Sequence, residues 1–171
     1  LDEFFRVRVA TLKRMEEYGK KLKNIDLVES PGKILEEIQE IVLEQQTEFS
    51  RIWEEIRREM GEQGIHIISE RQLSKEQQKF VQNYFDEEVR SNIIPLMPES
   101  IPQFPYLREK SIYLGVVLSR KDNSLKRKFA IIEVPSKTNG RFLKLPAPDG
   151  EQHIILLEDV IRFNLKSIFS Y

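Results

Sequence analysis

The stretch Gly61-Glu62-Gln63-Gly64-Ile65-His66-Ile67-Ile68 decides the fold, because two kinds of sequence pattern meet there. Upstream of Gly61, apolar residues recur every three or four positions, which is the period of a helix. Downstream of Gly64 the chain becomes rich in β-branched residues, which is typical of a short strand. The two glycines therefore predict a boundary between a helical domain over 1–64 and an α+β domain over 65–171.

The upstream part predicts two helices, over residues 1–23 and 32–63. Ser30 followed by Pro31 marks the start of the second, with serine as N-cap and proline at the first helical position. At 1.5 Å per residue this helix is about 48 Å long. Its apolar stripe is too wide for one neighbour to cover, so we expect a bundle that takes a further helix from upstream of Leu1. The stripe comprises Ile34, Leu35, Ile38, Ile41, Val42, Phe49, Ile52, Trp53, Ile56 and Met60.

The net charge of −1 hides an asymmetry between these helices. Residues 1–24 carry seven basic and four acidic side chains, whereas residues 32–63 carry four basic and nine acidic ones. Opposite charges favour packing of the two helices as an antiparallel hairpin. The basic cluster at residues 20–23 is expected to be a solvated helix end and no nucleic-acid site, because no aromatic residues or basic fold motif accompany it.

The downstream part alternates strands with helices. Ser74 and Gln77 form a capping box that opens a helix to about Ser91, and the prolines that follow exclude regular helix. Strands are predicted over 65–68, 111–119, 128–134, 141–145 and 154–157, with a hairpin turn at 121–124 and a final helix over 158–169. These elements predict an α+β module with one small, mainly antiparallel sheet.

A catalytic constellation is not visible in the sequence. The two histidines, His66 and His153, each lie in an apolar strand-like run, and the chain has no cysteine. Zinc sites need several suitably spaced ligands, so both histidines are expected to be structural or surface residues, with no metal site. Glycine spacing does not fit a phosphate-binding loop, and Trp53 is expected to pack in the core or between helices.

Arg8 breaks the local pattern, because at 100° per residue it falls in the centre of the apolar stripe of the first helix. A buried, unpaired guanidinium costs several kcal/mol. Two accounts stay open. Arg8 pairs with a glutamate of the acidic second helix or extends its stem to water, or it faces another domain, where a carboxylate or a bound phosphate completes it.

Four separated blocks of the sequence resemble the long bacterial polyphosphate kinases. Their order and spacing match that family across nearly the whole chain, and together they are far more specific than any one of them. The blocks are LDEFFRVRVATLK (1–13), ISERQLS (68–74), FAIIEVPS (129–136) with RFLKLP (141–146), and ILLEDVIR (155–162).

The resemblance implies a four-domain parent that reversibly transfers the terminal phosphate of ATP to polyphosphate through a phosphohistidine, with Mg²⁺. Residues 1–64 would be most of its helical amino-terminal domain, and residues 65–171 the first part of a head domain associated with dimer contacts. The nucleophilic histidine and the phosphate-binding arginines belong to the carboxy-terminal domains. The family's nucleotide-facing asparagine would lie just before Leu1, leaving Leu1, Asp2 and Glu3 as flanking residues, so no catalytic, nucleotide-binding or metal residue is carried over.

The start at Leu1, without an initiator methionine and in mid-pattern, predicts a piece of a longer polypeptide that is inactive alone. Its expected partners are the carboxy-terminal catalytic domains of the same polypeptide, ATP/ADP and polyphosphate in the parent, and a second copy bound through the head. The lack of cysteine, signal peptide and membrane-length apolar run favours a cytoplasmic location, with membrane association of the parent left open. The alternative is a stand-alone helical-hairpin interaction module without catalysis.

Overall fold

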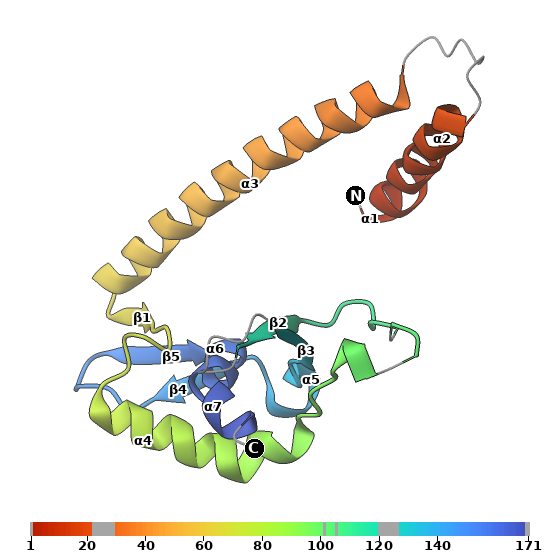
Figure 1. Ribbon diagram of the computed structural model, residues 1–171. Helices are drawn as coiled ribbons and strands as arrows, with labels where there is room; N and C mark the ends of the chain where they lie inside the picture. Colours follow the sequence, from red (N-terminus) through yellow and green to blue (C-terminus); the bar gives the residue numbers. More distant parts are fainter. Residues whose placement is uncertain (1, 22–29, 101, 105, 120–126, 170–171) are drawn as a thin grey trace. The chain divides into compact units, whose positions relative to one another are not determined.

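The computed structural model describes residues 2–21, 30–100, 102–104, 106–119 and 127–169 (Figure 1). The chain divides into two compact units, Leu1–Arg58 and Glu59–Tyr171, which we call the helical unit and the head unit. The division falls inside the long helix, shortly before the boundary predicted at Gly64. Each unit is described by itself.

The first predicted helix is interrupted by a π-helical segment. It consists of α1 (Asp2–Phe4), the π-helix η1 (Phe5–Val9) and α2 (Ala10–Lys21). The Thr11 hydroxyl donates to the Val7 carbonyl at 2.6 Å. A π-helical turn closes i→i+5 hydrogen bonds and takes more residues than an α-turn, so an apolar stripe calculated at 100° per residue does not continue across η1.

The second predicted helix is confirmed as α3 (Pro31–Glu62). Its polar face carries exposed ion pairs one turn apart, among them Arg51 with Glu48 at 2.7 Å; exposed pairs of this kind contribute little to stability because water screens them.

Much of the apolar face of α3 is exposed. No residue of α3 is buried; Phe49 is 72% exposed and Trp53 is 38% exposed, whereas the stripe residues Ile34, Leu35, Ile38, Val42 and Met60 are half-buried. Trp53 is therefore not part of a core among the described residues, and its packing against a further helix stays a prediction.

The head unit has two small sheets where the sequence predicted one. Strands β1 (Ile65–Ile67), β5 (Gln152–Leu156) and β4 (Phe142–Leu145) form the first in that spatial order, and β2 (Tyr113–Leu118) pairs with β3 (Lys128–Glu133) in the second. The β2–β3 and β4–β5 pairs are antiparallel, as expected, whereas β1 and β5 are parallel. The predicted turn at 121–124 lies outside the described residues.

Helix α4 (Lys75–Tyr84) begins at the predicted capping box. The Gln77 amide N–H donates to Ser74 Oγ at 3.2 Å, and the Ser74 amide donates to Gln77 Oε1 at 3.1 Å. The helix continues through the π-helix η2 (Phe85–Val89) into η3 (Arg90–Asn92), and the short 3₁₀ turn η4 (Pro98–Ser100) follows in the proline-containing segment. Figure 1 shows α4 along one edge of the head unit.

The predicted final helix is divided in two, α6 (Leu157–Phe163) and α7 (Leu165–Ile168). Asn164 separates them: it is 2% exposed, and its side-chain amide donates to the Val160 carbonyl at 2.9 Å. A side chain that bonds the backbone four residues earlier competes with the regular helix.

One core holds the head unit together, with contributions from α4, η2, β3, β4, β5 and α6. Its fully buried large side chains include Val81, Phe85, Val89, Ile132, Ile155, Leu157, Val160 and Ile161. Among the described residues, no helix combines the length and apolar character needed to cross a bilayer.

Candidate functional site

An ion pair between an exposed arginine and a buried glutamate joins two of the sequence blocks in the head unit. Arg141, just before β4, donates to Glu158 Oε1 at 2.8 Å, and the Glu158 side chain is only 9% exposed. This hydrogen bond raises the pKa of Arg141. The Leu157 amide also donates to the Arg141 carbonyl at 2.8 Å. The pair therefore fixes the start of α6 against the strand edge.

A second ion cluster joins the block at 68–74 to the block at 155–162. Arg162 pairs with Asp159 one turn earlier on α6 and lies 3.7 Å from Glu70. Asp159 is 7% exposed, so these charges also lie at the edge of the core. Blocks that are distant in the sequence thus meet around β5 and α6, and their charged residues serve packing.

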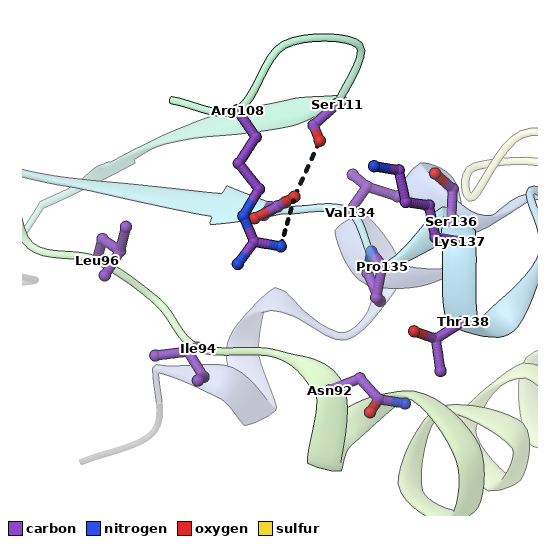
Figure 2. Close-up of a pocket in the computed structure, with 11 residues that line it drawn as sticks. Asn92, Ile94, Leu96, Arg108, Ser111, Val134, Pro135, Ser136, Lys137 and Thr138 are labelled. Carbon is purple, nitrogen blue, oxygen red and sulfur yellow. Dashed lines mark hydrogen bonds and ion pairs between the residues drawn. The ribbon is translucent and has the colours of Figure 1, made fainter. Parts of the chain in front are cut away.

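A pocket of about 370 Å³ opens where β3 ends and the short helix α5 (Ser136–Asn139) begins (Figure 2). Its polar lining has positive and negative groups. The Ser111 hydroxyl donates to Glu133 Oε1 at 3.0 Å, and Arg108 Nη1 lies 3.9 Å from the same oxygen. Figure 2 shows Lys137 and Thr138 on a separate wall, with Ile94 and Leu96 on another.

The pocket is suited to holding a polar group and has no arrangement for covalent chemistry among its lining residues. No histidine lines it. The Glu133 carboxylate contacts a serine hydroxyl and an arginine. This arrangement lacks the features of covalent catalysis, which needs a nucleophile hydrogen-bonded to a base that a third group orients. The hydroxyl groups of the lining and Lys137 can face a ligand or a neighbouring domain.

The two histidines lie together, contrary to the expectation that each is isolated. The parallel register sets His66 of β1 directly opposite His153 of β5, and their rings meet edge to face with centroids 5.4 Å apart. Glu151 completes the group, with its carboxylate Oε2 2.7 Å from His153 Nε2 and 4.0 Å from His66 Nε2. We call His66, Glu151 and His153 the histidine cluster.

Gln77 fixes the orientation of one ring in the histidine cluster. Its side-chain nitrogen donates to the Pro146 carbonyl at 2.8 Å and contacts His153 Nδ1 at 2.9 Å, while its oxygen accepts from the Ser74 amide. Because that nitrogen is a donor only, Nδ1 is the acceptor. The His153 proton then resides on Nε2, where it is donated to Glu151.

No local sequence pattern indicates the histidine cluster. His66 and His153 are each the middle of a three-residue run, Ile-His-Ile and Gln-His-Ile. This similarity becomes informative only once β1 and β5 are known to be parallel and in that register, because 84 intervening residues separate the two runs.

The residues named from the sequence at the amino end do not come together as a site. Leu1 lies outside the described residues, Asp2 begins α1 and Glu3 is exposed. Arg8, in η1, is exposed and has no ion pair within the described part of the chain. The expected pairing of Arg8 with a glutamate of α3 is therefore not observed among the described residues. Because Arg8 is exposed, its guanidinium does not pay the cost of an unpaired buried charge.

Two family models match the chain in succession. Residues 1–68 match the "Polyphosphate kinase N-terminal domain", and residues 76–171 match the "Polyphosphate kinase middle domain". The boundary between the two models coincides with the strand-to-helix connection after β1.

Similar proteins and a similar solved structure carry the same description. The polyphosphate kinase of Escherichia coli (strain K12) is 36% identical over 178 residues, and that of Vibrio parahaemolyticus is 32% identical over 172 residues; each alignment covers 99% of this chain and 24% of the relative. The crystal structure of polyphosphate kinase from Porphyromonas gingivalis superposes with a TM-score of 0.73 at 25% identity, over 80% of this chain and 23% of that one. The chain thus spans about a quarter of the length of the relatives it matches.

Proposed function

Because the chain belongs to the polyphosphate kinase family, we propose that it is the non-catalytic front portion of an ATP:polyphosphate phosphotransferase. In this role the helical unit supports the nucleotide site of the parent, and the head unit contributes an assembly surface. The parent reaction is the reversible transfer of the terminal phosphate of ATP to polyphosphate.

The observation that carries this proposal is the uncovered apolar face of α3. Phe49 and Ile41 are more than half exposed, and Ile52 and Ile56 extend the same stripe. An apolar surface of this kind on one helix face marks a place where another protein segment packs. The occupants we propose are a helix from upstream of Leu1 and the carboxy-terminal catalytic domains of the same polypeptide.

Arg8 supports the same role. It is exposed near Phe4 and Phe5, which are themselves 46% and 38% exposed, and it lies in a π-helical segment, a feature frequent at functional sites. A guanidinium in such a position is available to a carboxylate or a phosphate on another domain. We therefore place Arg8 at an inter-domain contact.

The chemistry of the parent is assigned to its carboxy-terminal domains. There a histidine would carry the phosphate, and Mg²⁺ with arginines would neutralise the developing charge. The histidines of this chain are engaged in a different arrangement, since His153 is bonded on both ring nitrogens. A cytoplasmic setting agrees with the need for ATP.

The head unit is proposed to bind a second copy of the chain. Val117 of β2 and Phe129 of β3 are directly paired across the strands, and both are at least half exposed. Cross-strand partners point to the same face of a sheet, so Val117 and Phe129 form a small exposed apolar patch on the β2–β3 sheet.

The test compares two proteins in ATP-dependent polyphosphate synthesis: the chain alone, and the same chain continued by the carboxy-terminal domains. We expect synthesis only from the longer protein. Turnover by the chain alone, in a preparation free of contaminating kinase, would contradict the non-catalytic assignment. The alternative of a stand-alone helical interaction module is not favoured, because the match over residues 76–171 is to a kinase middle domain.

A further inference from the structure

We propose that the histidine cluster binds a divalent transition-metal ion, with Zn²⁺ as the best-matched ion. Two imidazoles and one carboxylate form a ligand set known from zinc sites. One ligand atom from each of His66, Glu151 and His153 lies within 4.8 Å of the others. Imidazole nitrogens also suit copper and nickel but not Mg²⁺, which prefers oxygen ligands. The site is thus distinct in chemistry from a nucleotide-bound magnesium.

The distances in the cluster are close to those that a bound ion requires. Zinc bonds of about 2.0–2.1 Å in a tetrahedron set neighbouring ligand atoms about 3.3 Å apart. Glu151 Oε2 lies 2.7 Å from His153 Nε2 and 4.0 Å from His66 Nε2. These two distances bracket the required value, and the two imidazole ligand atoms lie within 4.8 Å of each other. Binding an ion therefore requires the side chains to draw together around it and the contact between Gln77 and His153 to change.

The backbone that carries the cluster is tightly fixed. Gly64 and Gly150 both have a positive φ, of 74° and 85°, and the Gln152 amide donates to the Gly64 carbonyl at 2.7 Å. A Cβ atom at Gly64 would lie only 3.0 Å from the Gly150 carbonyl oxygen. This close approach places Glu151 beside both histidines, and such preorganisation lowers the cost of assembling a site.

One proton must move for the ion to bind. In the arrangement described, His153 carries its proton on Nε2 and donates it to Glu151, while Nδ1 accepts from Gln77. Coordination through Nε2 displaces this proton, as metal binding to histidine commonly does. The ring then carries its proton on Nδ1, and the Gln77 amide turns to accept it or gives up the contact.

The cluster leaves room for a further ligand. His66 and Glu151 are both more than one-third exposed, whereas His153 is mostly covered. Three protein ligands with an open side leave a coordination position for water or for a group of another molecule. Bound metal would also connect β1 to the turn before β5, which stabilises the native state by mass action.

The experiment titrates the intact protein with Co²⁺, a visible probe for zinc sites, in a buffer that contains excess Mg²⁺. The wild type is compared with His66→Gln, with Glu151→Gln and with the double variant; Glu87→Gln, an exposed carboxylate on η2, is the matched control. We expect one equivalent of Co²⁺ with tetrahedral visible absorption in the wild type and the control. The single variants should bind at least tenfold more weakly, and the double variant should lose that equivalent. Equal binding by the wild type and the double variant would overturn the proposal.

A second variant gives a positive signal that does not depend on a loss. Glu151→Cys replaces the carboxylate by a thiolate in an exposed turn, in a chain that has no cysteine of its own. If position 151 is a ligand, the Co²⁺ complex acquires a sulfur-to-cobalt charge-transfer band that His66→Gln in the same background weakens. Absence of the band in a folded, reduced Glu151→Cys protein would equally overturn the proposal.

Discussion

Glu158 shows how a single charged residue is accommodated at the edge of the core. One of its carboxylate oxygens accepts from Arg141, while no described residue bonds the other, Oε2. A buried carboxylate of this kind is tolerated only while its partner remains in place, because an unpaired buried charge is far more costly than a pair. The contribution of Arg141 is therefore to prevent that penalty.

Replacing Arg141 with methionine is expected to lower the free energy of unfolding of the head unit by about 1–3 kcal/mol. This loss is smaller than the ~3–5 kcal/mol typical of breaking a fully buried ion pair, because the Arg141 side chain is 48% exposed and partly screened by water. Urea denaturation measures the loss.

Arg71→Met is the matched control for this change. Arg71 is 89% exposed and, within the described part of the chain, pairs with Glu70 beside it, so we expect a change within about 0.5 kcal/mol. Further, Glu158→Gln in the Arg141→Met background should restore part of the stability. An equal loss for both arginine variants would show that Glu158 needs no partner.

Some of these side-chain contacts could be predicted from the sequence. The capping box of Ser74 and Gln77 was predicted correctly, because both residues act within one helical turn. The histidine cluster was missed, because it depends on strands far apart in the chain. The burial expected of Arg8 is not observed, because the π-helical turn at Phe5–Val9 has no distinctive residue pattern and changes the faces of the helix; its contact with another domain stays a prediction.

At the scale of elements, α3 is a helix that forms without being buried. Its ends follow the sequence signals, with Pro31 at the first turn and Gly61 in the last. The part of its apolar stripe from Phe49 to Ile56, however, is exposed among the described residues. A helix with this stripe gains most of its stability from tertiary packing, so its behaviour depends on what lies against it.

Phe49→Glu tests the function of the stripe. In the chain alone the change should alter the free energy of unfolding by less than about 0.5 kcal/mol, because Phe49 is 72% exposed. In the complete protein, where we propose that the stripe is covered, the buried charge should cost about 2 kcal/mol or more and lower kinase activity. Thermal denaturation of both proteins gives the comparison.

Thr47→Glu serves as its control, since Thr47 is an exposed polar residue on the opposite face of the same helix and gains the same charge. It should leave both proteins nearly unchanged. If Phe49→Glu affects the complete protein no more than Thr47→Glu does, the stripe is not an inter-domain surface.

At the scale of the whole molecule, the order of helices and strands was predictable but their assembly was not. Period and turn signals located every strand and the long helices to within a few residues. Two sheets formed where one was expected, because β1 pairs in parallel with β5 and not with the neighbouring strands. Such pairing is determined by the packing of Val160, Ile161 and Phe85 in the shared core, which no local pattern expresses.

The assembly proposed for the head unit predicts that Val117→Glu shifts the complete protein to a smaller species. The substitution places a charge on an exposed apolar position of β2, where a partner copy would have to bury it. Sedimentation velocity measures the size. Lys144→Glu, an exposed charge reversal on β4, should leave the size unchanged, and the same size for the Val117 variant and the wild type would refute this surface.

Hydrogen exchange along α3 tests most directly whether the helical unit is a support that other parts of the parent cover. Amide exchange over residues 41–56 is measured in the chain alone and in the complete protein under identical conditions. We predict rapid exchange in the chain alone and protection of at least tenfold in the complete protein. Equal exchange rates in the two proteins would contradict the account.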